Sequence, residues 1–400
     1  MRYISPWIFL GLAILVTRVG AQDSTSPPAS TAATSAIDRS LILAIERREV
    51  AGAVGCVVTP EGLEYLKAFG KASIEPDQPM ETDQIFWIAS MSKPVAGVAL
   101  LQLQDQGKID LDDPVAKYLP ELSELQGGDG KTFQPTLRQL ISHTSGMAEL
   151  PPDQTYTSET LAEAVSRYRK LPLLFQPGSR WQYSQTSINT AARVVEVVSG
   201  LSYDRYLERS IFLPLGMRDT TFYLTDRQQE RLAKSYRREE SGEFVEQPIF
   251  LLAGHKPTGL DRFPAANGGL FSTAGDYARF CQMLLLKGQL GDTRILSESA
   301  VEEFQRPVTG DLEVGFTPGN AWGMGCCVVL HPQGVTSMLH PGSFGHGGAY
   351  GTQAWIDPVA RRAMIVMTQR TNFPNADGSQ LREDFQKAAV DSAGLGSAGK

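Results

Sequence analysis

Two residues that together can perform acyl transfer stand three positions apart near the end of the first quarter of the chain. Ser90 and Lys93 lie in the stretch FWIASMSKPVAGVALLQL, residues 86–103, and side chains three apart share one face of a helix. A serine hydroxyl is a poor nucleophile until a base removes its proton. A lysine can be that base when burial or nearby cations lower its pKa. The pair therefore predicts a nucleophile with an adjacent amine base.

Pro94 indicates where the helix that carries this pair begins. Proline lacks an N–H and is tolerated only in or next to the first turn, where that donor has no partner in any case. We therefore expect the helix to begin near Ser90 and to end at Gln106-Gly107. Ser90 would then lie at the positive end of the helix dipole, where free backbone N–H groups can hold an anion.

The stretch ASMSK at the start of an apolar helix resembles the nucleophile motif of the serine β-lactamase and penicillin-binding protein superfamily. The resemblance is to class C β-lactamases and to related esterases and D-alanyl-D-alanine carboxypeptidases, with Ser90 as nucleophile and Lys93 as general base. A second motif of the superfamily, Tyr-x-Asn, is matched by Tyr183-Ser184-Gln185 in PGSRWQYSQTSINTAARVVEVVSG. By this resemblance Tyr183 is a phenolate-type base or proton shuttle, and Gln185 takes a substrate-binding position where the family has Asn.

The third motif of the superfamily is Lys-Thr-Gly on the edge strand of its sheet. The matching stretch FGHGGAYGTQAWIDP places His346, Gly347 and Gly348 there, followed by Ala349. The resemblance makes all four substrate-site residues, and it pairs the Ala349 N–H with the N–H of Ser90 in an oxyanion hole. One such donor commonly contributes ~3 kcal/mol to transition-state stability. Because Lys-Thr is the pair that grips a substrate carboxylate, its replacement by His-Gly favours a neutral ester as substrate.

These motifs leave several functions open, and we rank the functions by the chemistry that each requires. We expect a carboxylic ester hydrolase that works through a Ser90 acyl-enzyme. The alternative is a class C-like β-lactamase or a D-alanyl-D-alanine carboxypeptidase, whose substrate would be a β-lactam or a peptidoglycan-like peptide. A non-catalytic binding module is disfavoured because Ser90, Lys93 and Tyr183 are all present. An α/β-hydrolase needs Gly-x-Ser-x-Gly, and residues 341–345, the nearest match, lack the first glycine.

The order of predicted elements indicates an α/β protein with the β-lactamase/transpeptidase-like fold. This fold has a mainly antiparallel sheet flanked by helices, together with an all-helical lobe. Strand-like and helix-like patterns assign residues 37–100 and 265–393 to a sheet lobe and 101–264 to the helical lobe. The resemblance covers 37–393, and 394–400 form a tail.

The N-terminal residues have the composition of an export signal. Residues 1–21 contain the apolar run YISPWIFLGLAILV, which is shorter than the ~20 residues that a membrane span needs. A cleaved signal is therefore favoured over an anchor, and no stable membrane span is expected. Residues 22–36 are rich in Ser, Thr, Pro and Ala and indicate a flexible linker. We expect a periplasmic or secreted protein.

Composition disfavours several other classes of protein. The net charge of −7 offers no basic surface for nucleic acid. The five histidines are scattered and no CxxC or HExxH occurs, so neither a metal site nor a cofactor is expected. Four cysteines are too few for a disulfide scaffold. We interpret them as buried thiols, with a bridge from Cys56 to Cys326 or Cys327 as the alternative. His143 in SHTSG is interpreted as a hydrogen-bonding residue of a turn.

Overall fold

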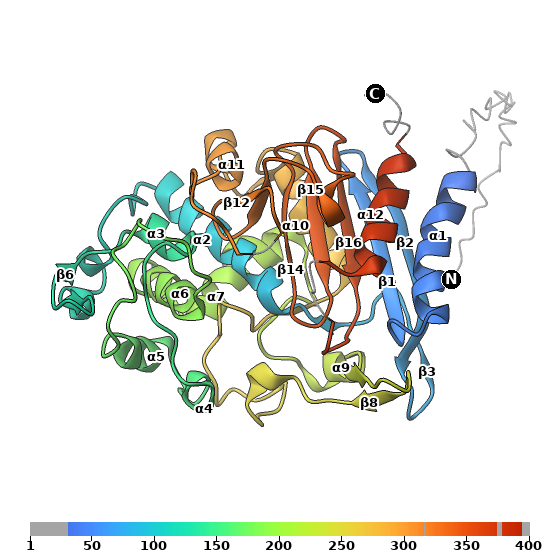
Figure 1. The fold of residues 1–400 in the computed structure, drawn as a ribbon, viewed down its shortest axis with the longest axis horizontal. Helices are drawn as coiled ribbons and strands as arrows, with labels where there is room; N and C mark the ends of the chain where they lie inside the picture. Colours follow the sequence, from blue (N-terminus) through green and yellow to red (C-terminus); the bar gives the residue numbers. More distant parts are fainter. Residues whose placement is uncertain (1–30, 316, 374–377, 394–400) are drawn as a thin grey trace, which may run out of the picture.

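An eight-stranded sheet made from both ends of the chain forms one half of the protein (Figure 1). The computed structural model describes residues 31–315, 317–373 and 378–393. The strand order is β12-β13-β14-β15-β16-β1-β2-β3, and every neighbouring pair is antiparallel. The N-terminal β1 pairs directly with the C-terminal β16, with Val54 opposite Met367. This confirms the prediction that the two ends of the chain share one sheet.

The elements have the following bounds. The strands of the large sheet are β1 Gly52–Thr59, β2 Gly62–Ser73, β3 Gln78–Pro79, β12 Asn320–Trp322, β13 Cys327–Val329, β14 Phe344–Gly347, β15 Gln353–Asp357 and β16 Arg362–Met367. Short two-stranded ribbons pair β4 Phe86–Trp87 with β9 Phe271–Ser272, β5 Leu125–Gln126 with β6 Thr132–Phe133, β7 Tyr236–Arg238 with β8 Phe244–Glu246, and β10 Gln289–Leu290 with β11 Thr293–Arg294. The α-helices are α1 Thr31–Glu46, α2 Ser92–Asp105, α3 Leu137–Ile141, α4 Pro152–Thr155, α5 Leu161–Tyr168, α6 Gln185–Ser199, α7 Tyr203–Leu207, α8 Leu213–Leu215, α9 Asp226–Gln229, α10 Ala274–Leu285, α11 Glu298–Gln305 and α12 Gln380–Asp391.

Both faces of the sheet are covered, so its central strands are apolar on both sides. Along β1, Val54 and Cys56 belong to the core that continues toward α10 and α2, whereas Val57 belongs to the core under α1 and α12. This alternation is the period-2 geometry of a strand. A Cβ on Gly55 would lie 2.7 Å from atoms of Leu41 and Phe385. The glycine therefore lets α1 and α12 approach the sheet closely.

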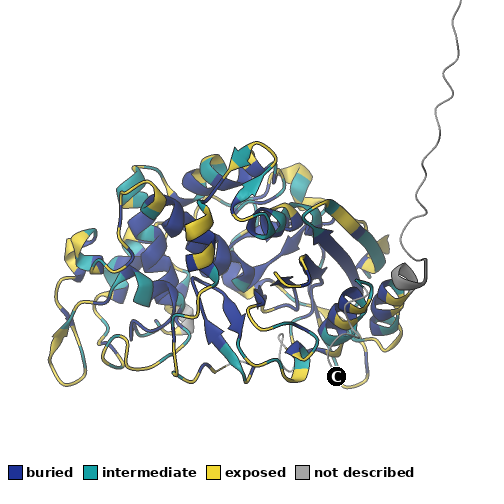
Figure 2. Ribbon diagram, turned by 90° about the horizontal axis from the view of Figure 1, so that it is seen from above, coloured by how far each residue is buried: buried dark blue, intermediate teal, exposed yellow. Residues whose placement is uncertain are grey.

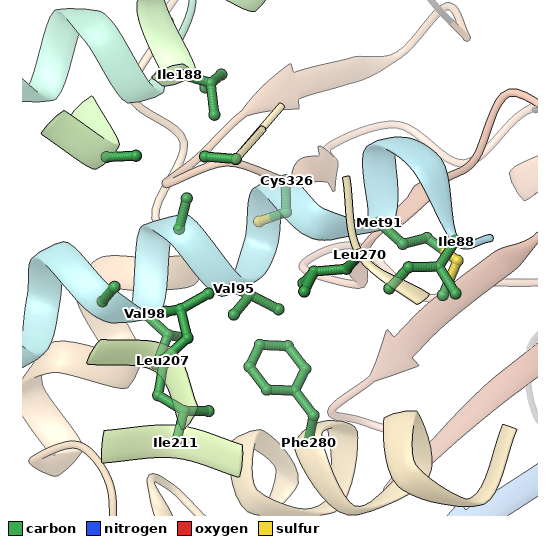
Figure 3. Packing of buried hydrophobic residues seen from close by; sticks show 14 of the residues in the cluster. Ile88, Met91, Val95, Val98, Ile188, Leu207, Ile211, Leu270, Phe280 and Cys326 are labelled. Carbon is green, nitrogen blue, oxygen red and sulfur yellow. The ribbon is translucent and has the colours of Figure 1, made fainter. Parts of the chain in front are cut away.

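Helix α2 runs between the sheet and the helices α3–α7 and is buried along most of its length (Figures 1 and 2). Val95 and Val98 point toward Leu207, Ile211 and Phe280 of the neighbouring helices (Figure 3). The helix that begins at the Ser-x-x-Lys pair is therefore packed inside the core that runs from one face of the sheet into the helices.

Three predicted boundaries need correction. Residues 31–36 were assigned to the linker, but α1 begins at Thr31. Extending a nucleated helix is much easier than starting one, so the packed stretch from Ile37 onward carries the helix backward. The lobe boundary at 100/101 cuts through α2, because one continuous helix joins both halves. The predicted helical lobe also contains the β7–β8 ribbon, which joins the sheet side through Tyr236 N–H to Gln369 O at 3.0 Å.

Some predictions fall wholly or partly on residues outside those that the structure describes. The predicted signal and most of the linker, together with the tail 394–400, lie outside the described residues. Among the residues described, no helix is long and apolar enough to cross a membrane, and no cluster of His, Cys, Asp or Glu could hold a metal ion. All four cysteines are buried and none forms a disulfide bond, as predicted, so neither alternative bridge from Cys56 forms.

Helix α2 is in tight contact with the turn before β13. Adding one methyl group to α2 at this contact should therefore lower the stability of the protein. A Cβ on Gly97 would clash with the Met324 carbonyl oxygen and lie 3.2 Å from the Phe304 ring. Overpacking against backbone outweighs the better helix propensity of alanine. We expect Gly97→Ala to lower the free energy of unfolding by about 2 kcal/mol, measured by urea denaturation.

The matched control is a helical glycine with open space around it. Gly275, in the first turn of α10, has its nearest neighbour, Thr273 Oγ1, 4.0 Å from a built Cβ. Gly275→Ala should leave the stability unchanged or raise it by up to about 1 kcal/mol. Equal behaviour of the two variants would contradict the packing argument.

Candidate active site

The predicted nucleophile lies at a tight corner between β4 and α2. Residues Ala89–Met91 form a 3₁₀ turn that runs directly into α2. Ala89 has φ 47°, in the left-handed region that an alanine adopts only under constraint. The buried Ser92 hydroxyl braces the corner, because it donates to Ala89 O at 2.7 Å and accepts from Leu270 N–H at 3.2 Å. The corner leaves Ser90 partly exposed, and the helix begins where Pro94 predicted.

Lys93 is completely buried directly behind Ser90. Its Nζ lies 3.1 Å from Ser90 Oγ and 2.5 Å from the carbonyl oxygen of Asn267, and 4.5 Å from the centre of the Tyr183 ring. Burial lowers the pKa of the Lys93 amine well below its usual value, and only the charge of Glu149 opposes this shift. A neutral amine can donate to Asn267 O while its lone pair accepts the Ser90 proton. The geometry is that of a nucleophile with its base.

Tyr183 joins the pair to the strand that carries the third motif. Its hydroxyl lies 3.3 Å from His346 Nε2, and His346 Nδ1 lies 2.6 Å from the carbonyl oxygen of Gly347. Because a carbonyl only accepts, Nδ1 must carry the proton, and Nε2 is left to accept from Tyr183. Burial first, and the nearby Lys93 second, lower the pKa of His346 to about 3. His346 is therefore neutral at every pH at which the protein would work.

The end of β14 packs against the Ser90 corner. A Cβ on Gly348 would lie 2.6 Å from the carbonyl oxygen of Ile88, so only glycine lets the strand approach this closely. The Gly348 N–H donates to Thr352 O at 2.7 Å and is used within the turn. Ala349 follows on the exposed side of that turn. The amide of Ser90 lies in the first helical turn, where N–H groups have no partner within the helix.

Two residues that the sequence analysis did not assign complete the surroundings of Lys93. Asn267 holds Lys93 through its backbone, and its side-chain Nδ2 donates to Gln185 Oε1 at 3.1 Å. Glu149 Oε1 accepts the backbone N–H of Gln185 at 2.5 Å. Gln185 thus meets Lys93 by way of Asn267. The Asn-Gly-Gly sequence after two alanines was the available signal for Asn267, whereas nothing in the sequence marks Glu149.

An aromatic cluster forms the wall behind Tyr183. His143 lies within 4.4–6.0 Å, centre to centre, of the rings of Trp181, Tyr183 and Trp322. Its Nδ1 accepts the backbone N–H of Ser184 at 3.0 Å, which confirms the prediction of a hydrogen-bonding residue in a turn. Burial lowers the pKa of His143 well below its usual value. The wall is therefore uncharged as well.

Comparison with known proteins agrees with this geometry. The sequence profile of the family described as Beta-lactamase matches residues 37–389. The chain belongs to the β-lactamase family. It is a serine hydrolase of that family, and its relatives include Esterase EstB of Burkholderia gladioli, 29% identical over 358 residues, or 81% of this chain and 87% of the relative. A protein of Escherichia coli named "Putative D-alanyl-D-alanine carboxypeptidase" is 26% identical over 382 residues, or 85% of this chain and 83% of the relative.

A solved structure with a similar fold supports this result. The chain superposes on EstCE1, described as a hydrolase with promiscuous acyltransferase activity, with a TM-score of 0.76 at 24% identity. The match covers 88% of this chain and 98% of that one. The predicted β-lactamase/transpeptidase-like fold, with its antiparallel sheet flanked by helices, is confirmed.

The low pKa of Lys93 predicts how the reactivity of Ser90 depends on pH. A depressed pKa means that the base form is present above that pKa and is lost as the pH falls through it. The rate of Ser90 labelling by a p-nitrophenyl phosphonate should therefore rise with pH through one ionisation and level off below pH 10.5, the ordinary value for lysine. Released p-nitrophenolate measures this rate between pH 5 and 10.

Lys93→Arg is the matching variant, since a guanidinium cannot be deprotonated in proteins. We expect labelling at the plateau to fall by at least about 100-fold, the usual contribution of general base catalysis. A flat pH profile in the native protein, or native-like labelling of the variant, would show that another group activates Ser90.

Proposed function

We propose that the protein is a carboxylic ester hydrolase that acts through a Ser90 acyl-enzyme. The observation that carries this proposal is the neutral His346 at the position where the Lys-Thr-Gly motif has a cation. Its Nδ1 donates to Gly347 O, and its pKa of about 3 keeps it uncharged. The next residue, Gly347, has no hydroxyl, whereas the motif has a threonine at that position. The site is thus built for an uncharged substrate.

Acylation would use the groups already in contact. As Ser90 Oγ attacks the ester carbonyl carbon, its proton passes to Lys93 Nζ, 3.1 Å away. The carbonyl oxygen becomes an oxyanion that the amides of Ser90 and Ala349 would hold. The bond to the alcohol oxygen then breaks, and that oxygen takes the proton from Lys93, with the Tyr183 hydroxyl as the shuttle. The alcohol leaves and the acyl group remains on Ser90.

Deacylation would reverse the same proton path. A water molecule attacks the acyl carbonyl and gives its proton to the neutral Lys93. Collapse of the second tetrahedral intermediate breaks the bond to Ser90 Oγ, which takes that proton back. The carboxylic acid leaves, and both residues return to their first state. Apart from this water, both halves of the proposed cycle use groups of the chain itself.

A carboxypeptidase or β-lactamase activity is the alternative function. The relative of E. coli whose name includes D-alanyl-D-alanine carboxypeptidase supports it, and EstB supports an esterase. Peptidoglycan-like peptides and β-lactams carry a carboxylate that must be bound by charged or hydroxyl groups. His346 and Gly347 supply neither, so the ester is favoured.

We also propose that the protein works in the periplasm or outside the cell. The support is the sequence of residues 1–21, with Arg2 before an apolar run and small residues before a plausible cleavage site. Soluble esters that reach this compartment would be its substrates.

The proposal predicts a preference between two esters of similar size. p-Nitrophenyl butyrate and p-nitrophenyl hemisuccinate differ mainly in the methyl and carboxylate groups at the acyl end. We expect kcat/KM to be at least about tenfold higher for butyrate, because His346 and Gly347 offer no charge or hydroxyl to offset the desolvation of a carboxylate. Ser90→Ala should abolish hydrolysis of both, while the native Tm is retained.

Intact mass after incubation with a penicillin distinguishes the alternative. A persistent adduct on the native protein but not on Ser90→Ala, together with no ester hydrolysis, would overturn the esterase in favour of a penicillin-binding peptidase. Equal rates of ester hydrolysis by native protein and Ser90→Ala would overturn the mechanism itself. Consumption of the ester alone, with no adduct and no penicillin consumed, is the result expected.

A further inference from the structure

Lys93 is tied to the N-terminus of α6 by a continuous series of hydrogen bonds. Lys93 Nζ contacts Asn267 O at 2.5 Å, Asn267 Nδ2 donates to Gln185 Oε1 at 3.1 Å, and Gln185 N–H donates to Glu149 Oε1 at 2.5 Å. A second amide, that of Thr186, donates to the same oxygen at 3.4 Å. We name Glu149, Gln185 and Asn267 the relay. It begins at the base and ends on a carboxylate.

Asn267 is the rigid centre of this relay. Its backbone N–H donates to Asn189 Oδ1 at 3.2 Å, and its Nδ2 also contacts the Tyr156 hydroxyl at 3.0 Å. With these bonds and that to Gln185, two segments, α6 and the turn after α4, hold one residue whose carbonyl contacts the Lys93 amine. Because the carbonyl cannot move without breaking several bonds, the side chain of Gln185 influences Lys93 without touching it.

We propose that the relay is a positioning device for Lys93, in which Gln185 aligns the amine through Asn267 and the charge of Glu149 sets the pH range over which that amine is a base. Gln185 is a positioning residue in this proposal, rather than one that binds substrate. The proposal rests on the role of Lys93 as the base of the proposed function.

The titratable groups around Lys93 come from four segments of the chain. Tyr183 places its ring over Nζ, and His143 and His346 flank the amine from the turn after α3 and from β14. Both histidines are neutral, because burial keeps their pKa values low. Glu149 is the group whose charge favours the ammonium form of Lys93. Burial raises the pKa of Glu149. The backbone N–H groups of Gln185 and Thr186 and the charge of Lys93 oppose this shift, because they stabilise the carboxylate.

Glu149→Gln tests the electrostatic part of the relay. Glutamine keeps an oxygen acceptor for the amides of Gln185 and Thr186 but removes the charge. The acid limb of the pH profile for Ser90 labelling by a p-nitrophenyl phosphonate should then move to lower pH by roughly half a unit or more, because the ammonium form has lost its counter-charge. An unmoved limb would show that Glu149 only caps α6 and would overturn this part.

Glu196→Gln is the matched control for this charge. Glu196 lies near the other end of α6, and its Oε1 also accepts a backbone N–H, that of Tyr203, at 3.0 Å. The same chemical change there should leave the limb in place. A shift of equal size in both variants would mean that the total charge of the protein, and not the relay, sets the pH range.

Gln185→Met tests the positioning part. Methionine fills a similar volume but cannot accept from Asn267, so the amine should lose alignment with Ser90. We expect the plateau rate of labelling to fall roughly tenfold, and for p-nitrophenyl butyrate we expect kcat to fall with KM nearly unchanged. A raised KM with unchanged labelling would instead mean that Gln185 binds substrate directly.

Gln102→Met serves as the control for a lost buried amide, since Gln102 Nε2 donates to the carbonyl oxygens of Ser210 and Ile295 far along α2. It should lower the Tm and leave labelling unchanged. The phosphonate reaction does not depend on the natural substrate. Labelling without ester hydrolysis would therefore overturn the ester proposal while the relay stands, whereas no labelling of the native protein would overturn both.

Discussion

Burial of the Lys93 amine is the constraint on which the rest of the site depends. A fully buried ammonium is costly, and the protein offers this one no direct ion pair among the contacts of the described residues, only the more distant charge of Glu149. The neutral amine relieves that cost, and it is also the form that can take a proton from Ser90. Since the folded pKa lies below the unfolded value, stability rises with pH between the two. Folding and catalysis thus favour the same protonation state.

The same burial removes charge from the whole reacting surface. His143 and His346 are both neutral, first because burial lowers their pKa values and second because Lys93 is near enough to lower them further. The Tyr183 hydroxyl is then a donor to His346 Nε2, and its ring faces the amine. The proposed preference for a neutral ester depends on this loss of charge, because a substrate carboxylate would lose its water without gaining a cation from His143 or His346.

The sheet and the segments packed against it hold these groups through backbone contacts, so few of the groups can move independently. The N-terminal β1 and the C-terminal β16 pair in the interior of the sheet, and the end of β14 brings Gly348 against the carbonyl of Ile88, just before the nucleophile. The opposite wall comes from the start of α6 and the loop at Asn267. The site therefore lies where the sheet and the helices meet, at the start of α2, whose apolar residues pack in the core between them. Disturbing the packing of α2 would disturb the nucleophile and the base together.

The sequence alone determined the fold class and the start of the helix near Ser90. The first follows from the order of strand-like and helix-like patterns together with three spaced motifs, and the second from a proline that only a first turn accepts. The beginning of α1 was misplaced for a related reason. The composition of residues 31–36 indicates a linker, but a helix stabilised by packing further along the chain extends through them.

The tertiary structure alone decided the electrostatics and the connections of the site. Nothing near His346 in the sequence shows that its Nδ1 meets the Gly347 carbonyl in a dry interior, and its neutrality follows from that burial. Glu149 and Asn267 are 118 positions apart, yet both bond to Gln185, and Asn267 O also contacts Lys93. Pairing over such separations and the loss of water are properties of the folded chain. Residue types and spacing predict which groups can react, while burial decides which of them carry charge.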